Sequence, residues 1–323
     1  MHHRHHEEEA ATQQFAAPSQ PGSATIDTPP TATGGGQVPL PTSAMGSEPT
    51  SLPAVAQERI GRITRGEAAA ASMSGYGEYV MLAETGFEPI GPVVGLTVMH
   101  LGRIQLAGIK TACELESYSN VISMGILTAL ARVQEEARLI GADGVILSSI
   151  DRHNFDGEEH QYAAKGTAVR FTPQPGALQT PQGRPFVCQL SAMTLYQMLR
   201  RGLAPVAIGY GVCVYHVPHR SMRQAVSQTF QNREIPIFTE GWYTGREIAI
   251  SRLHSQLEGQ GATLILDMNI QEEAEAFGEH TSEFKAVGMG WVHRPEVAQL
   301  VPSVDLVAPA LIERGAIYPT SSV

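Results

Sequence analysis

Histidines are the side chains of this 323-residue sequence that could do chemistry, because an imidazole binds divalent transition metals and exchanges protons near neutral pH. His100 ends the stretch FEPIGPVVGLTVMH, and His216 ends the similar stretch LAPVAIGYGVCVYH. At equivalent ends of two strands, the pair could ligate a metal or line the pore of a ring. We favour a structural role, in which each closes an apolar face and hydrogen-bonds a neighbouring turn, because one histidine per strand does not make a metal site.

A second group of possible metal ligands lies between residues 151 and 161. His153 and His160 flank Asp156, Glu158 and Glu159 in a stretch that is typical of a polar hairpin loop. Carboxylates and imidazoles at this density could bind a divalent cation. Such a loop is more often a solvated turn, and we favour that interpretation.

The first nine residues, MHHRHHEEE, place four histidines beside three glutamates. These histidines are His2, His3, His5 and His6. Such a tract can chelate a transition metal without any fold, but it could equally be an expression tag or an incidental polar tail. The sequence therefore indicates no certain cofactor, and the metals that it leaves open are zinc, nickel and copper.

Signatures of catalysis are missing from the sequence. It contains no G-x-S-x-G nucleophile motif, no H-E-x-x-H zinc motif, no P-loop and no G-x-G-x-x-G turn after a strand. Cys213 and His216 form a C-x-x-H pair, but residues three apart on a strand point to opposite faces. We therefore expect a protein that is not an enzyme.

Composition limits the partners and the location of the protein. The formal net charge is −10, from 32 acidic and 22 basic residues, which argues against a nucleic-acid-binding surface. Apolar runs fall short of the roughly 18–20 residues that a membrane helix needs, and the N-terminus has no apolar signal region. Cys113, Cys188 and Cys213 are too scattered for a disulfide framework. We expect a cytoplasmic protein that binds no nucleic acid and does not insert into a membrane.

A small set of strands and helices must position the histidines. After the strand at 87–101, residues 125–143 carry apolar side chains at 4-3 spacing, which predicts a helix that stops at Gly141. The β-rich runs 144–150 and 162–171 follow. The predicted order is therefore β-α-β-β.

The same order recurs in the second half of the sequence. A short helix at 191–202 precedes a strand at 203–217, a long helix at 245–263 and two further strands. Matching residues lie 116 to 122 positions apart: Gly95 and Gly211, His100 and His216, Gly141 and Gly261, and Gly166 and Gly288. This period is far longer than the 20–50 residues of solenoid repeats, so we predict a duplication into two tandem domains.

Changes in composition divide the chain into six segments. The first is rich in Pro, Ser, Thr and Gly without an apolar period, which is typical of disorder. The segments are a disordered tail at 1–53, a short helix or linker at 54–74, a first domain at 75–172, a linker at 173–189, a second domain at 190–296 and a C-terminal tail at 297–323.

The predicted strands are apolar on both faces, although one helix can cover only one face. Val94 and Val98 point away from Val93 and Met99, and all four side chains are apolar. Strands of this kind are buried against a further layer, which could be the sister domain, another chain or the C-terminal segment. The pattern favours a homo-oligomer.

Three stretches of the first domain resemble a known family. GFEPIGPVVGLTVMH, EEARLIGADGVI and YAAKGTAVRF resemble the YbjQ-like heavy-metal-binding domain family, and residues 190–296 carry a more divergent copy. The resemblance implies two α+β domains of the dodecin-subunit kind, each an antiparallel sheet plus a helix, that assemble into a pentameric or stacked ring. It implies no catalytic activity and assigns no metal ligands.

These observations lead to three hypotheses for function. The first is a non-enzymatic, self-assembling scaffold or binding protein whose ring surface or pore is the working part. The second is a heavy-metal-binding or metal-buffering protein that uses the loop and tail histidines. The third, with the least support, is an enzyme with a site between the domains.

Overall fold

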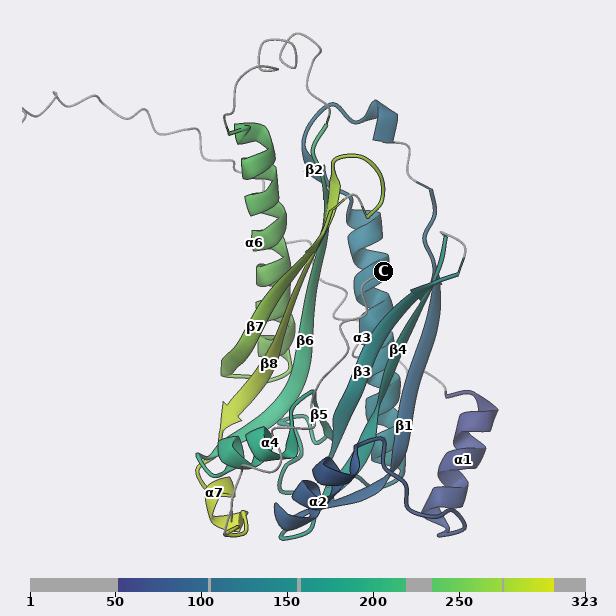
Figure 1. The fold of residues 1–323 in the computed structure, drawn as a ribbon, viewed down its shortest axis with the longest axis vertical. Coiled ribbons are helices and arrows are strands. Elements are labelled where there is room, and N and C mark those ends of the chain that lie inside the picture. Colours follow the sequence, from purple (N-terminus) through teal and green to yellow (C-terminus); the bar gives the residue numbers. More distant parts are fainter. Residues whose placement is uncertain (1–51, 104–105, 156–157, 219–233, 275, 305–323) are drawn as a thin grey trace, which may run out of the picture. The chain divides into compact units, whose positions relative to one another are not determined.

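The computed structural model describes residues 52–103, 106–155, 158–218, 234–274 and 276–304 (Figure 1). The predicted disordered tail at 1–53, with its four histidines, lies outside these residues except for its last two positions. Residues 305–323 of the predicted C-terminal tail also lie outside them.

The described helices include two long ones and several short ones. They are α1 (Ala54–Thr64), α2 (Tyr76–Glu84), α3 (Glu116–Leu139), α4 (Ala192–Leu199), α6 (Pro236–Gly259) and α7 (Val297–Leu300), with a 3-10 turn at Leu106–Gly108. The strands are β1 (Phe87–His100), β2 (Cys113–Glu114), β3 (Gly144–Asn154), β4 (Glu159–Phe171), β5 (Phe186–Cys188), β6 (Leu203–His216), β7 (Leu264–Glu273) and β8 (Thr281–His293). Among the described helices, none combines the length and the apolar character that crossing a bilayer requires.

One eight-stranded sheet runs through the described residues in the order β1-β4-β3-β5-β6-β8-β7, with β2 paired to β6. The pairs are antiparallel except at β5, which is parallel to both β3 and β6. The fold is therefore mixed α+β. The sequence predicts a separate antiparallel sheet for each domain, whereas β5, which lies within the predicted linker at 173–189, joins the strands into one mixed sheet.

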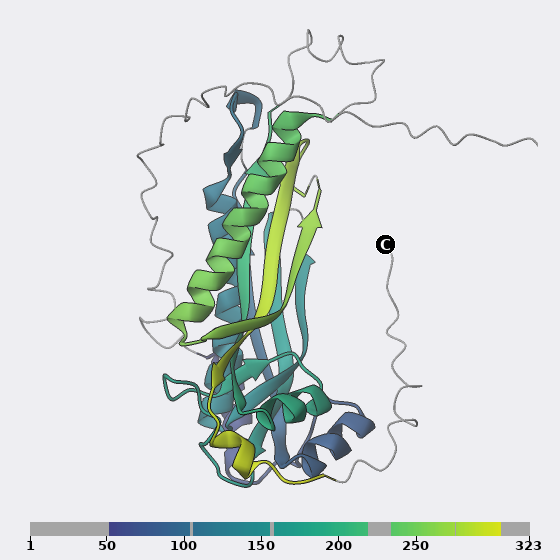
Figure 2. The ribbon, with the colours of Figure 1, turned by 90° about the vertical axis from the view of Figure 1, so that its left-hand side faces the viewer.

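Two sets of elements within this sheet have the predicted β-α-β-β order. We call β1, α3, β3 and β4 the first unit, and β6, α6, β7 and β8 the second unit. In both units the first strand pairs with the last along nearly its whole length, and the long helix packs on that pair. Figure 2 shows α6 lying along the strands of the second unit.

Both long helices begin earlier than the sequence predicts. Gly125 and Gly245, the predicted first residues, lie inside α3 and α6. Each glycine faces an aromatic ring of its own unit: a Cβ on Gly125 would lie 2.4 Å from Tyr162, and one on Gly245 would lie 2.6 Å from Phe284. These glycines make room for a ring, and they do not mark the start of a helix.

The strand glycines serve a similar purpose. A Cβ on Gly95 would lie 1.9 Å from the carbonyl oxygen of Ala129, and one on Gly211 would lie 1.9 Å from that of Ala249. Only a glycine lets the helix approach the strand this closely. The two units therefore repeat the same helix–strand contact at matching positions.

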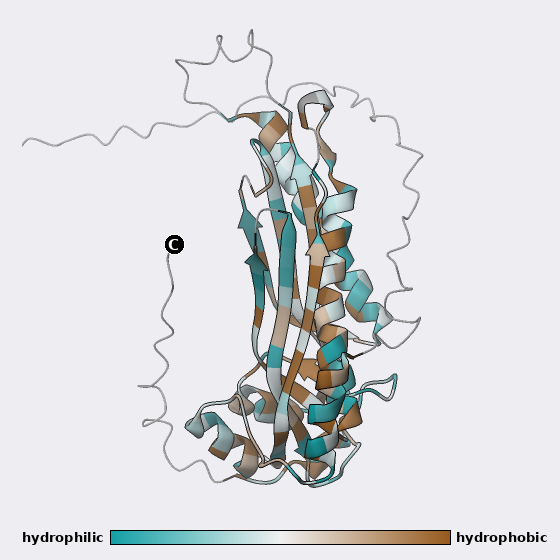
Figure 3. Ribbon diagram, turned by 90° about the vertical axis from the view of Figure 1, so that its right-hand side faces the viewer, coloured by the Kyte–Doolittle hydropathy of each residue, from teal (hydrophilic) through white to brown (hydrophobic). Residues whose placement is uncertain are grey.

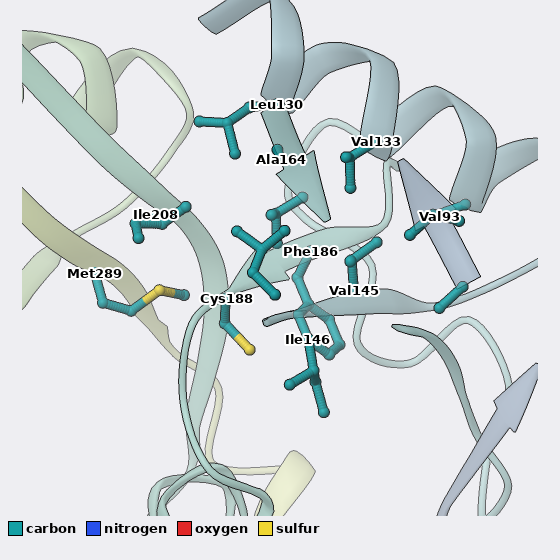
Figure 4. Packing of buried hydrophobic residues seen from close by; sticks show 14 of the residues in the cluster. Val93, Leu130, Val133, Val145, Ile146, Ala164, Phe186, Cys188, Ile208 and Met289 are labelled. Carbon is teal, nitrogen blue, oxygen red and sulfur yellow. The ribbon is translucent and has the colours of Figure 1, made fainter. Parts of the chain in front are cut away.

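Buried apolar residues form two clusters. The larger includes Leu130 of α3, Val145 of β3, Phe186 of β5 and Ile208 of β6, so it spans both units (Figure 4). The smaller lies between α6 and the strands β6 and β8. Hydrophobic and hydrophilic residues follow one another along the strands in Figure 3. The core is continuous across the join that β5 makes.

Candidate functional site

His100 and His216 end β1 and β6, and the structure gives them different surroundings. The His100 side chain is 60% exposed, with Nδ1 3.4 Å from Glu159 Oε1. His216 is buried, and its Nδ1 lies 2.9 Å from Thr281 Oγ1. Because β4, β3 and β5 separate β1 from β6 in the sheet, these histidines do not share one site.

His153 and His160 lie on adjacent strands and not in a loop. The sequence predicts a polar turn over 151–161, but β3 continues to Asn154 and β4 begins at Glu159. His153 is exposed and lies opposite Gln161, whereas His160 is buried and lies opposite Asn154. The two imidazoles therefore point to opposite faces of the sheet.

The described side chains include no group of three or more His, Cys, Asp or Glu that could hold a metal ion. His2, His3, His5 and His6 lie outside the described residues. The thiols of Cys113, Cys188 and Cys213 are free. Burial raises the pKa of the Cys188 thiol to about 12, and burial also raises the pKa of Cys213, so both thiols are protonated at neutral pH.

The contact between the two units is the best-defined polar site in the structure. β6 is buried along almost its entire length, because α6 covers it from its own unit and α3 and β2 contact it from the first unit. The Leu115 N–H donates to Val214 O at 2.8 Å, and the Val214 N–H donates to Ser119 Oγ at 2.8 Å. The start of α3 thus binds the backbone of a strand in the other unit.

An ion pair closes this contact. Arg252 of α6 donates through both Nη atoms to the carboxylate of Glu114, with Nη2 3.0 Å from Oε2. Arg252 Nη1 also donates to Val212 O at 2.7 Å. Both side chains are mostly buried, so this bidentate pair is a strong one. Arg252 therefore joins its own strand to the carboxylate that the first unit supplies.

The first unit repeats part of this arrangement at its own strand β1. Glu136 Oε2 accepts from the Val94 N–H at 2.8 Å, as Gln256 Oε1 accepts from the Tyr210 N–H at 2.7 Å. Arg132 Nη1 donates to Leu96 O, as Arg252 donates to Val212 O. The helix of each unit therefore hydrogen-bonds the backbone of the first strand of that unit in the same way.

The outer side of β1 differs from that of β6 in its exposure. Leu96 is 43% exposed and Val98 is 58% exposed, whereas the matching Val212 and Val214 are fully buried. The sequence predicts burial on both faces of these strands, and the structure shows it for β6 alone. The first unit therefore presents an apolar strand surface of the kind that the second unit buries.

A pocket of about 200 Å³ lies between the units. Arg152 Nη1 lies 2.5 Å from Glu283 Oε2, and Arg152 Nη2 lies 2.6 Å from Glu273 Oε2. Burial lowers the pKa of Lys285, and burial raises the pKa of Tyr162 to about 12. Arg152 thus pairs with two carboxylates of the second unit across the pocket.

A second hollow, of about 320 Å³, lies at the N-terminal end of α6. We call it the aromatic groove, and it is lined by Phe238, Trp242, Tyr243 and Phe284, among others. Trp242 Nε1 donates to Glu272 Oε1. Ile122, which occupies the position of Trp242 in the first unit, is fully buried. The start of α6 is thus open where the start of α3 is covered.

Sequence reasoning missed the charged residues of the unit contact. Arg252 follows Arg132, and Glu234 follows Glu114, by 120 residues, which is one of the spacings that align the glycines. An alignment of the two halves at this spacing would have found them, whereas a search for metal ligands does not.

Comparisons with known proteins agree with the resemblance seen in the sequence. Residues 85–172 match the YbjQ_1 family, which is described as "Putative heavy-metal-binding". A UPF0145 protein of Lacticaseibacillus casei is 33% identical over 89 residues, which are 26% of this chain and 82% of that protein. A UPF0145 protein of Archaeoglobus fulgidus is 34% identical over 88 residues, which are 26% of this chain and 82% of that protein. These relatives correspond to one unit.

A longer relative matches most of the chain. The Encapsulin nanocompartment protein Rv1762c of Mycobacterium tuberculosis is 37% identical over 241 residues, which are 74% of this chain and 90% of that protein. No solved structure matched the chain significantly. The chain therefore belongs to the family of this mycobacterial protein and carries a YbjQ-type unit at residues 85–172.

Proposed function

We propose that this protein is a non-enzymatic, self-assembling component of a nanocompartment. Its mycobacterial relative is named an encapsulin nanocompartment protein, and the match covers 90% of that protein. This similarity supports a role in a nanocompartment. The free thiols of the three cysteines fit the cytoplasmic location that we expect.

The observation that carries this proposal is the difference between β1 and β6. Within the chain, the second unit buries the outer side of β6 against α3 and β2 of the first unit. β1 has the same sequence pattern, but its outer side stays exposed at Leu96 and Val98. An exposed apolar strand of this kind is an interaction surface, and another copy of the chain can cover it.

The repeated contacts also support a duplication into two domains, at 75–172 and 190–296. The same glycine–helix approach and the same helix-to-strand hydrogen bonds occur in both units. Units that bind each other in one direction can close into a ring. We infer a closed homo-oligomeric ring, pentameric or stacked, in which each chain supplies two units.

Light scattering on the full chain tests the proposal. The chain has a mass of 34.7 kDa, and we expect a particle of several times this mass during size-exclusion chromatography. A particle of one chain mass over the whole range of micromolar concentrations would contradict self-assembly.

Metal binding is the alternative function, and the description of the matching family favours it. The candidate ligands are His100, His216, His153 and His160 in the described residues and the four histidines of the tail. Calorimetric titration of the full chain with Zn²⁺, Ni²⁺ or Cu²⁺ tests it, alongside a variant in which His2, His3, His5 and His6 are replaced by alanine. Heat that persists in this variant assigns the site to the rest of the chain, and no heat in either protein contradicts metal binding.

A further inference from the structure

We propose that copies of the chain join head to tail, so that the start of α6 in one copy binds the outer side of β1 in the next, with Glu234 paired to Arg132. This inference rests on the proposed self-assembly and names the surfaces that carry it. The occupant of both surfaces is a second copy of the same chain.

The contact inside the chain provides the template. The segment that leads into α3 pairs with the end of β6, with Cys113 opposite His216 and Glu114 opposite Tyr215. Glu114 then receives Arg252, the arginine of the helix that covers β6. One unit thus offers a short strand, a helix start and a carboxylate, and the other offers a strand side and an arginine.

The second unit contains residues that match those with which the first unit binds β6. The residues that lead into α6 keep the chemistry of those that lead into α3, in the order carboxylate, aliphatic, aromatic and hydroxyl. The matching pairs are Glu114 and Glu234, Leu115 and Ile235, Tyr118 and Phe238, and Ser119 and Thr239. Ser119 is almost fully buried in the contact, whereas Thr239 is partly exposed. The second unit therefore has the helix start and the carboxylate of this contact, and the described residues do not cover Thr239 as they cover Ser119.

The first unit contains a strand and an arginine that match β6 and Arg252 of the template. Arg132 occupies the position of Arg252 and makes the same hydrogen bond to the strand, at Leu96 O. In the described part of the chain Arg132 forms no ion pair, and its Nε is buried without a hydrogen-bond partner. The partly buried guanidinium donates through Nη1 to a neutral carbonyl only, so a carboxylate that reaches its Nη atoms, as Glu114 reaches those of Arg252, would stabilise it.

Glu234 is the matching carboxylate. It is exposed, and within the described residues it takes part in no ion pair. In the template, a glutamate at this position binds the arginine with two hydrogen bonds. Glu234 of a second copy can therefore bind Arg132 in the way that Glu114 binds Arg252 inside the chain.

The apolar surfaces are complementary in the same way. Leu96 and Val98 project from the outer side of β1, and the aromatic groove opens at the start of α6. In the template, the matching Val212 and Val214 are fully buried. The proposed contact would bury both Leu96 and Val98, which favours association in water.

Helix α1 sets the limit of the contact along β1. Arg59 of α1 donates to Pro92 O at 2.7 Å, and a Cβ on Gly91 would lie 3.3 Å from Ile63. This end of β1 is already covered, so the neighbouring copy binds the part from Val94 to His100. The two sides of the contact are different surfaces, which makes it a heterologous contact of the kind that generates rings.

A charge swap tests this contact. We expect Glu234→Arg, which changes an exposed residue, and Arg132→Glu each to weaken association by about 30-fold or more, because each leaves one charge facing its like. Glu234→Arg combined with Arg132→Glu restores the pair and should restore assembly. Glu258→Arg, an equally exposed residue further along α6, is the matched control and should assemble as the wild type does.

Light scattering at several concentrations, with circular dichroism to verify folding, separates the outcomes. A monomeric wild type contradicts self-assembly itself. An oligomeric wild type whose two single variants assemble unchanged contradicts this contact and leaves self-assembly standing. Dissociation of the single variants with recovery in the double variant supports it, and Glu234→Arg keeps the test valid if Arg132→Glu unfolds.

Discussion

Arg132 and Arg252 occupy matching positions in the two units, and they differ in the side chains that bind them. Each donates from the helix of its unit to a carbonyl of the strand beneath. Arg252 also binds Glu114, whereas Arg132 forms no ion pair with any described side chain. The first unit supplies Glu114 to the arginine of the second unit. Within the described residues, no earlier unit supplies a glutamate to Arg132 in the same way.

The strand glycines give a prediction at the same scale. Gly95→Ala would place a Cβ against the backbone of α3, so we expect the free energy of unfolding to fall by about 1–3 kcal/mol. Urea denaturation measures the change. Gly102→Ala is the control, since a Cβ there meets nothing within 4 Å, and its effect should stay within about 0.5 kcal/mol. Equal effects of the two substitutions would contradict the idea that the close approach of α3 to β1 requires a glycine at position 95.

Lys285 gives a prediction for pH. Burial lowers its pKa, with Glu283 opposing, so the folded state binds fewer protons than the unfolded state between this lowered pKa and the ordinary value of 10.5. Stability therefore rises as the pH rises through the folded pKa towards that value. We expect Lys285→Met to be more stable than the wild type at pH 7 and to lose this advantage near pH 10. The measurement is urea unfolding at both pH values, with exposed Lys110→Met as control; an advantage that does not change with pH would contradict the assignment.

At the scale of elements, β5 is the piece that turns two units into one sheet. It has three residues, and it is hydrogen-bonded to β3 on one side and to β6 on the other. Phe186 on this strand is fully buried, and its ring packs against Gly144, where a Cβ would lie 2.2 Å away. The continuity of the sheet between the units therefore depends on a very short element.

Replacing Phe186 with alanine should accordingly lower the free energy of unfolding by about 3–5 kcal/mol, because it empties the core where the two units meet. Thermal or urea unfolding measures the loss. Phe155→Ala removes a ring that is 62% exposed and should change stability by no more than about 0.5 kcal/mol. If both variants unfold at the same urea concentration as the wild type, β5 does not hold the units together.

The β-α-β-β order and the matching glycines could be predicted from the sequence, because apolar periodicity and close helix–strand approach are local requirements. β5 could not be predicted, since three residues become a strand only when β3 and β6 flank them. The beginnings of α3 and α6 were also hidden, because Gly125 and Gly245 resemble helix boundaries until the rings beside them are known. Arg132 and Glu234 are ordinary charges on a helix and in a loop, and only alignment of the two halves singles them out.

At the scale of the whole molecule, having two units in each chain constrains any assembly. A ring built from whole chains contains an even number of units, so five chains would give ten. The UPF0145 relatives match one unit over 82% of their length, and each copy of such a chain would add a single unit. In the ring that we propose, the two-unit chain thus replaces every second contact between copies with one inside the chain.

Helix α1 makes the two kinds of junction unequal. Inside the chain, the contact of α3 with β6 extends from Leu115, which donates to Val214 O, to a small hollow lined by Gln134 and Ala207. In the contact that we propose between copies, α1 already covers β1 at Gly91 and Pro92, so that contact would be shorter. In the assembly that we propose, dilution would therefore separate intact chains, because the contact beside α1 would open before the contact inside each chain.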